Sequence, residues 1–194
     1  MRILSGKLKG SKILTNEDKI KGSEDFITRP TSDRVKETLF NIVQHGFNID
    51  FANVSFLDCF SGSGAIGLEA ISRGCLSVSF LEKNNAACEC IKKNLANFKL
   101  IDNDNGLGYR ILNYDFFDND LLLGNEFDLV FLDPPYEMAE VSQVFLRLKE
   151  LRVTKKNSLI IYESNKELVK VDKLEILKSR KTGKTYLSFL KFLN

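Results

Sequence analysis

The residues with the clearest chemical meaning stand in a row, Asp133-Pro134-Pro135-Tyr136, directly after the apolar run at 127–132. Two prolines stiffen the backbone and remove two N–H donors, which leaves carbonyl oxygens and the Asp133 carboxylate as a rigid set of acceptors. Such acceptors can hold an exocyclic amine by its two N–H groups and aim its nitrogen at a methyl donor. Tyr136 adds a face on which a base can stack. We therefore expect these four residues to form the catalytic pocket; the structural alternative is a Pro-Pro turn with a packed tyrosine.

A second motif is rich in glycine. The apolar run at 54–60 is typical of a buried strand, and Gly62, Gly64 and Gly67 follow it as G-x-G-x-x-G. The first glycine is expected to make the tight turn, the second to let a ligand approach the backbone, and the third to pack a helix on the strand. The pattern alone also suits the pyrophosphate of NAD or FAD, and it occurs in loops that bind no ligand.

Three acids near this loop narrow the choice of cofactor. Asp58 would repel a pyrophosphate but attract the ammonium and sulfonium groups of S-adenosylmethionine, unless it only caps the next helix. Glu82 ends the next apolar run, where an acid accepts hydrogen bonds from ribose hydroxyls in NAD sites as well. Asp115 can accept from an adenine amino group or be a surface turn residue. The predicted cofactor-binding residues are Asp58, Phe60, Ser61, Gly62, Ser63, Gly64, Gly67, Glu82, Lys83, Asp115 and Phe116.

The elements that must position these residues alternate between strand and helix from residue 54 onward, which predicts a parallel sheet with right-handed crossovers. Strands are expected at 54–60, 77–81, 109–112, 127–132 and 158–162. Helices are expected at 65–72, 84–98 and 141–151. The runs at 174–177 and 186–192 flank Thr182-Gly183 and predict an antiparallel hairpin. The candidate acids all fall at or just after the ends of predicted strands.

The first 50 residues are expected to form a basic arm and a helix that pack on the main domain, residues 51–194. Ile3-Leu4 and Ile13-Leu14 predict a small hairpin, and 15–24 a loop. A helix begins at Asp33 and ends at Gly46, with Thr31 or Ser32 as its N-cap.

The charge and the cysteines of the chain limit the partners, metal sites and cellular location that we expect. The net charge of +2 and the pI near 8.3 permit a nucleic-acid partner without requiring one. Basic residues cluster before residue 13 and again at 178–184, where a solvated surface is the default interpretation. The four cysteines lack C-x-x-C spacing, so we expect no metal site. Neither a signal peptide nor a membrane span is visible, and we expect a cytoplasmic monomer with reduced thiols.

The motifs together resemble known methyltransferases. The sequence L-D-C-F-S-G-S-G around Asp58 is similar to the first motif of Rossmann-like methyltransferases, and D-P-P-Y at 133–136 resembles amino-directed ones. The block R-P-T-S-D-R-V-K-E-T-L-F-N at 29–41 resembles the RsmD family, which methylates N2 of a guanine in 16S ribosomal RNA. The resemblance covers nearly the whole chain, including Glu163 after Ile160-Ile161-Tyr162. The sequence departs from the family at Lys9-Gly10-Ser11-Lys12, where the family tends to have arginine. Lysine still carries positive charge but cannot make the bidentate hydrogen bonds of arginine.

The resemblance implies a Rossmann-like class I α/β fold with strand order 3-2-1-4-5-7-6 and an antiparallel strand 7. It implies S-adenosylmethionine as cofactor and, as partner, 16S ribosomal RNA in an assembling or assembled small subunit, with the target guanine flipped into the pocket at 133–136. The RNA-binding residues that it implies are Arg2, Lys7, Lys9, Lys12, Arg29, Thr31, Arg34, Arg180 and Lys184.

Two alternatives stay open. A DNA adenine-N6 or protein glutamine-N5 methyltransferase uses the same type of tetrapeptide, although a DNA enzyme usually carries a separate recognition domain and no segment here is long enough for one. A non-catalytic RNA-binding factor for ribosome assembly would have a vestigial cofactor site. The intact Asp58, Glu82 and Asp133 argue against this second alternative.

Overall fold

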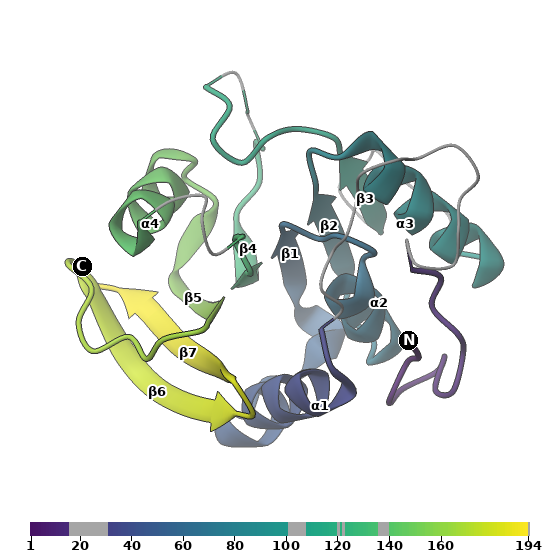
Figure 1. Ribbon diagram of the computed structural model, residues 1–194, viewed down its shortest axis with the longest axis horizontal. Helices are drawn as coiled ribbons and strands as arrows, with labels where there is room; N and C mark the ends of the chain where they lie inside the picture. Colours follow the sequence, from purple (N-terminus) through teal and green to yellow (C-terminus); the bar gives the residue numbers. More distant parts are fainter. Residues whose placement is uncertain (16–30, 101–107, 120, 122, 136–139, 194) are drawn as a thin grey trace.

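The fold is built on one seven-stranded sheet (Figure 1). The computed structural model describes residues 1–15, 31–100, 108–119, 121, 123–135 and 140–193. The strands are β1 Ser55–Cys59, β2 Ser77–Leu81, β3 Tyr109–Leu112, β4 Phe127–Leu132, β5 Thr154–Ser164, β6 Leu174–Thr182 and β7 Thr185–Phe192. The helices are α1 Asp33–Asn41, α2 Ala65–Ser72, α3 Asn85–Asn97 and α4 Val141–Glu150.

The strand order is β3-β2-β1-β4-β5-β7-β6, which confirms the order that the family resemblance implied. The first five strands pair in parallel, while β7 is antiparallel to both β5 and β6. Because β1 pairs with both β2 and β4, the direction in which strands are added reverses at β1. In open α/β sheets, a crevice for ligands forms at the carboxyl ends of the strands at such a reversal.

Alternating strand residues build two apolar layers, one on each face of the sheet. Phe56, Phe131 and Ile161 pack in the cluster that contains α1, α2, α3 and the N-terminal arm. Their neighbours Leu57, Leu132 and Tyr162 pack in the cluster that contains α4. Successive strand side chains point to opposite faces, so a strand covered on both sides reads as a continuous apolar run. This explains why the central strands were recognisable in the sequence.

The helix ends follow local capping signals. The Ser32 hydroxyl accepts a hydrogen bond from the Val35 N–H at 3.3 Å and caps α1. The α-helix ends at Asn41, earlier than expected, and continues as one π-helical turn, Ile42–Gly46. The Phe47 N–H closes this turn on the Ile42 carbonyl at 3.0 Å. A short 3₁₀ turn, Phe51–Asn53, then leads into β1.

The N-terminal arm, residues 1–15, is held by buried polar side chains of the helices. The Glu69 carboxylate on α2 accepts from the Leu4 and Ser5 N–H groups at 2.7 and 3.0 Å, and Glu69 is fully buried. Asn94 on α3 accepts from the Leu14 N–H at 2.8 Å. The expected small hairpin is present: the Ile3 N–H donates to the Ser11 carbonyl and the Ile13 N–H to the Met1 carbonyl, on either side of the bridge between Arg2 and Lys12.

Two strands are longer than the sequence pattern suggested. The strand expected at 158–162 runs over Thr154–Ser164, and the one expected at 174–177 runs to Thr182. Most of β6 is exposed, so it lacks the apolar alternation that marks a half-buried strand. The loop expected at 15–24 falls almost entirely outside the described residues. In the part of the chain that the structure describes, no helix is long and apolar enough to cross a membrane.

Candidate functional site

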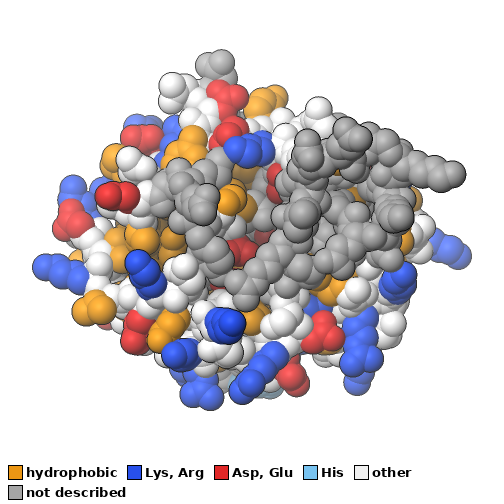
Figure 2. All heavy atoms as spheres, viewed as in Figure 1, with side chains coloured by type: hydrophobic (Ala, Val, Ile, Leu, Met, Phe, Trp, Pro, Cys, Tyr) orange, Lys and Arg blue, Asp and Glu red, His pale blue; other side chains and the backbone are white. Residues whose placement is uncertain are grey.

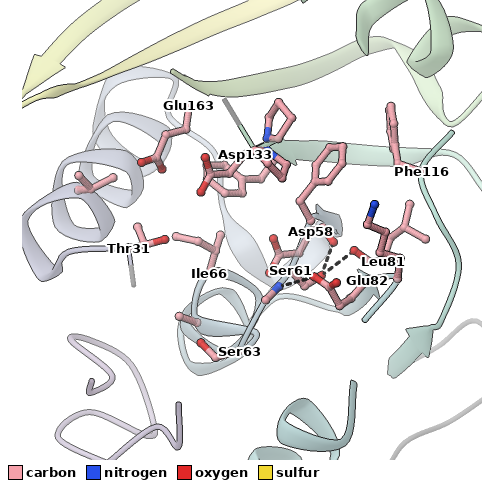
Figure 3. A pocket seen from close by; sticks show the side chains of 18 of the residues that line it. Thr31, Asp58, Ser61, Ser63, Ile66, Leu81, Glu82, Phe116, Asp133 and Glu163 are labelled. Carbon is pink, nitrogen blue, oxygen red and sulfur yellow. Dashed lines mark hydrogen bonds between the residues drawn. The ribbon is translucent and has the colours of Figure 1, made fainter. Parts of the chain in front are cut away.

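A cavity of about 440 Å³ opens at the carboxyl edge of the sheet, where the strand order reverses (Figure 3). This volume lies within the ~300–1,000 Å³ that is usual for small-molecule and cofactor sites. One wall comes from β1, β2 and the loops that follow them, with residues 114–116 after β3 at its outer part, and the other comes from β4, β5, β7 and the start of α1. We call these the β1–β2 wall and the β4–β5 wall.

Asp58 lies at the buried base of the β1–β2 wall. It is 1% exposed, and its Oδ2 accepts the Gly67 N–H at 2.9 Å. Burial, with a smaller contribution from the nearby carboxylates of Asp133 and Glu82, raises the pKa of this carboxyl to about 8, although the Gly67 hydrogen bond opposes the shift. A bound cation would relieve this repulsion, whereas a pyrophosphate would add to it. The electrostatics of the cavity therefore suit a cationic ligand.

Glu82 joins the glycine loop to β2. Its two carboxylate oxygens accept the N–H groups of Gly62 and Asn84, both at 2.8 Å. Each oxygen keeps a further lone pair, so ribose hydroxyls can still donate to this carboxylate. Ser61 fastens the same loop, because its hydroxyl donates to the Asp58 carbonyl at 2.6 Å. Hydrogen bonds within one strand–helix–strand unit thus shape the loop.

Glycine is favoured at each of the three positions of the motif for a different physical reason. Gly62 has φ +55° and lines the cavity. Gly67 packs α2 on β2 as expected, because a Cβ there would lie 2.2 Å from the ring of Phe80. Gly64 was expected to admit a ligand, but it lies on the Phe80 side of the loop. Gly64 has φ +78°, and a Cβ added at this position would lie 3.2 Å from the Phe80 ring, so a larger residue is disfavoured here.

Aromatic side chains close the outer part of the β1–β2 wall. Phe60 and Phe116 both line the cavity, and their ring centroids are 5.0 Å apart. Phe60 adopts φ +60°, a conformation that costs a bulky residue of the order of 1–3 kcal/mol and is most often found at functional sites. Lys83 and Asp115 line the same region and form an ion pair at 3.2 Å. This region can hold a flat ring between apolar and polar groups.

The β4–β5 wall carries the residues of the predicted catalytic pocket. Asp133, Pro134 and Pro135 follow β4 and line the cavity, whereas Tyr136 lies outside the described residues. The influence of Asp133 on the pKa of Asp58 shows that the two walls share one electrostatic environment. The structure thus places the first three residues of the tetrapeptide in the same cavity as the predicted cofactor residues.

Several residues of this wall were given no site role in the sequence analysis. Glu163 at the end of β5, Ser32 and Val35 at the start of α1, and Thr185 at the start of β7 all line the cavity. Glu163 had a usable signal, because it is an acid directly after an apolar strand, as Asp58, Glu82 and Asp133 are at or beyond the ends of theirs. Thr185 had none, since its position depends on how β7 pairs with β5.

The predicted RNA-binding residues lie on the surface, and not all of them are near the cavity. The Arg2 side chain reaches Asp33 at the start of α1, whereas the backbone of Lys7 binds Ser72 at the far end of α2. Seven described basic residues are exposed, namely Arg2, Lys7, Lys9, Lys12, Arg34, Arg180 and Lys184. Figure 2 shows Lys and Arg side chains gathered along the lower margin of one face, below the central acidic side chains. Thr31 lines the cavity itself, and Arg29 lies outside the described residues.

The described residues contain no group of three or more His, Cys, Asp or Glu side chains placed to hold a metal ion. The four cysteines are buried thiols. Burial raises the pKa of the Cys88 thiol to about 11, so this thiol stays protonated near neutral pH. The polar groups of the cavity are carboxylates, hydroxyls, backbone groups and the Lys83 side chain.

Comparison with known proteins gives consistent matches along the chain. The family model described as conserved hypothetical protein 95 matches residues 1–191. The "Ribosomal RNA small subunit methyltransferase D" of Haemophilus influenzae is 34% identical over 94% of this chain and 89% of that protein. The protein of that name from Buchnera aphidicola subsp. Baizongia pistaciae is 31% identical over 100% and 93%.

A solved structure agrees with these sequence matches. The proposed methyltransferase yhhF of Escherichia coli superposes with a TM-score of 0.76 at 26% identity, over 100% of this chain and 98% of that chain. The fold is thus the Rossmann-like fold of class I methyltransferases. With its family model matched over nearly every residue and relatives above 30% identity at full length, the chain belongs to the RsmD family.

Proposed function

We propose that this protein uses S-adenosylmethionine to methylate ribosomal RNA of the small subunit, at the exocyclic N2 of one guanine in 16S RNA. The observation that carries the proposal is the meeting of two motifs in one cavity: Asp133-Pro134-Pro135 faces the buried acids Asp58 and Glu82. An acceptor-rich pocket for an amine beside a site for a cationic nucleoside fits transfer of a methyl group to nitrogen. The names of the relatives support RNA as the substrate.

The β1–β2 wall fits the cofactor in size, charge and shape. Asp58 and the loop at 62–67 would hold the amino-acid half, Glu82 the ribose, and Asp115 with Phe116 the adenine. When bound, the cofactor supplies an activated methyl group. The chain's own contribution is to hold a cation beside the Asp58 carboxylate and to pack the nucleoside against the adjoining rings of Phe60 and Phe116.

The β4–β5 wall would orient the nucleophile. The Asp133 carboxylate and the Pro134 carbonyl accept the two N–H groups of the guanine N2 amine, and Tyr136 stacks on the base. The nitrogen gains positive charge as it forms its new bond, so the hydrogen bond to Asp133 strengthens most in the transition state. A base reaches this depth only when it is flipped out of a helix, which costs a few kcal/mol. The exposed basic residues would offset part of that cost by contacting phosphates.

The proposal is tested by transfer of a labelled methyl group from S-adenosylmethionine to small ribosomal subunits and, separately, to naked 16S RNA. Mapping of the modified nucleotide should give N2-methylguanine at one position. Label in adenine-N6 of DNA or in glutamine of protein would establish the alternative enzyme class. Binding to the subunit without transfer of label would establish a non-catalytic assembly factor. Calorimetric titration completes the test, with binding of S-adenosylmethionine and none of NAD as the expected result.

A further inference from the structure

We propose that Glu163 reads the N1–H of the target guanine and so selects guanine over adenine and cytosine. The inference rests on the proposed function and adds a specificity-determining residue to it. It begins from Glu163, a carboxylate in the cavity that has no role in holding the amine, because Asp133 and Pro134 accept both N–H groups of the amine. Glu163 is 7% exposed, and it lines the cavity at the end of β5.

The sheet register places Glu163 beside Asp133. Leu132 on β4 pairs with Tyr162 on β5, so the next residues of the two strands are Asp133 and Glu163. Leu132 and Tyr162 pack in the apolar cluster with α4, and the residues that follow them point to the other face, toward the cavity. Neighbouring strands lie ~4.8 Å apart, which is within the reach of one base edge for two carboxylates. Figure 3 shows both side chains directed into the same space.

The bases differ at the position next to their amine. Guanine presents its N2 amine beside N1–H, which is a second donor. Adenine and cytosine present their amines beside a ring nitrogen with a lone pair, which is an acceptor. A carboxylate accepts but cannot donate while it is ionised. With the amine held by Asp133 and Pro134, Glu163 would therefore pair with guanine and repel the other two bases.

The surroundings of Glu163 agree with a guanine edge. Hydroxyl groups of Thr31 and Thr185 lie on the same wall, and Thr185 is 4% exposed. A hydroxyl can donate to O6, the acceptor that completes the edge of guanine. A carboxylate offers about four lone-pair sites, so contacts that Glu163 makes within the protein leave room for N1–H. Acceptors beside a donor match the order of groups along guanine alone.

The experiment compares two residues against two bases. The wild-type protein and Glu163→Gln are assayed on RNA that carries either guanosine or 2-aminopurine ribonucleoside at the mapped position. 2-Aminopurine keeps the N2 amine but has an acceptor at N1. The Gln amide can accept from N1–H of guanine and can donate to N1 of 2-aminopurine. We expect the ratio of kcat/KM for guanosine over 2-aminopurine to fall by about tenfold to a hundredfold in the variant.

Controls separate base reading from a structural role. Glu126→Gln makes the same chemical change at an exposed residue before β4 begins, at the opposite edge of the sheet, and should leave the ratio unchanged. Thermal melting and cofactor titration report on folding and on the β1–β2 wall. If the Gln variant is unstable, Glu163→Asp serves instead, because it withdraws the carboxylate by one methylene. It should then lose about tenfold in kcat/KM on guanosine, with a smaller loss on 2-aminopurine, so the ratio should fall in this variant too.

The outcomes distinguish the two proposals. Equal ratios for wild type and Glu163→Gln, with guanine N2 still methylated, would overturn the role of Glu163 and leave the proposed function intact. An undiminished rate of Glu163→Asp on guanosine would do the same. Methylation of adenine or cytosine by the wild-type protein would overturn both. A reduced ratio with unchanged cofactor affinity supports both.

Discussion

The two walls of the cavity are assembled in different ways. The inner part of the β1–β2 wall comes from one continuous stretch, residues 58–82, in which Asp58 and Glu82 accept backbone N–H groups of the segment between them, and residues 114–116 after β3 complete its outer part. The β4–β5 wall collects residues from four distant segments, at 31–35, 133–135, 163 and 185. The first wall is organised by local hydrogen bonds, and the second by the pairing of strands and the docking of α1.

The difference predicts a division of roles. Carboxylates of the β1–β2 wall are tied to the backbone, so changing them should alter cofactor binding and stability together. Carboxylates of the β4–β5 wall lie at strand ends beside prolines and should act on the substrate, with little effect on the cofactor. The following experiments test this division, starting with the largest expected effect.

Replacing Asp133 should separate chemistry from binding. Asp133→Ala is expected to lower the rate of methyl transfer by about 10²- to 10³-fold, because the hydrogen bond to the amine is strongest in the transition state. Single-turnover rates measure this effect, and calorimetry should show nearly unchanged affinity for S-adenosylmethionine. Wild-type rates in a variant with wild-type melting would refute the amine pocket.

Removing surface charge should weaken RNA binding alone. Replacing Lys7, Lys9, Lys12, Arg180 and Lys184 by Ala is expected to reduce the salt dependence of RNA affinity by roughly one charge per residue and to lower affinity about a hundredfold at low salt. Binding titrations over a range of salt concentrations give the slope. An unchanged slope would return these residues to ordinary solvated surface. Cofactor affinity serves as the control.

Replacing Glu82 should affect binding and stability together. Glu82→Ala leaves the Gly62 and Asn84 N–H groups without their acceptor, which costs about 1–3 kcal/mol for each group that stays buried. We expect a lower melting temperature and about tenfold weaker cofactor binding. Glu82→Gln keeps one acceptor and should be milder in both. A variant that loses rate but keeps stability and affinity would contradict the assigned role of this wall.

The last experiment concerns the proton on Asp58. Its pKa of about 8 in the free protein lies above its unfolded value, so between pH 4 and 8 the folded state binds more protons than the unfolded state. The stability that this proton contributes is full below pH 4 and is lost as the pH rises through 8. A cationic cofactor selects the ionised form, so its affinity should increase by up to about tenfold per unit between pH 6 and 8.

Calorimetry in buffers of different ionisation enthalpy should detect up to one proton released per cofactor bound at pH 7. Asp58→Asn should abolish this release, because the amide can still accept the Gly67 N–H but carries no proton to lose. A wild-type protein that binds S-adenosylmethionine without releasing a proton would show that Asp58 is already ionised.

The strand–helix alternation, the glycine loop and the acids at strand ends could all be predicted from the sequence. Each depends on residues close together in the chain: apolar runs bury both faces of a strand, Ser32 caps α1, and Gly67 admits the ring of Phe80. Even so, local signals misplaced some boundaries. The range predicted for the exposed strand β6 was too short, and the π-helical turn after Asn41 has no recognisable sequence pattern.

Only the tertiary structure decided which distant residues meet. Glu69 and Asn94 hold the arm through side-chain hydrogen bonds to its backbone, and such contacts leave no periodic pattern in a sequence. Glu163 stands beside Asp133 because β5 pairs with β4 in one register, and a shift of one residue would have turned its side chain to the other face. The residues of the β1–β2 wall could therefore be predicted from short sequence motifs. The β4–β5 wall depends on long-range strand pairing, which is selected by packing in the folded protein.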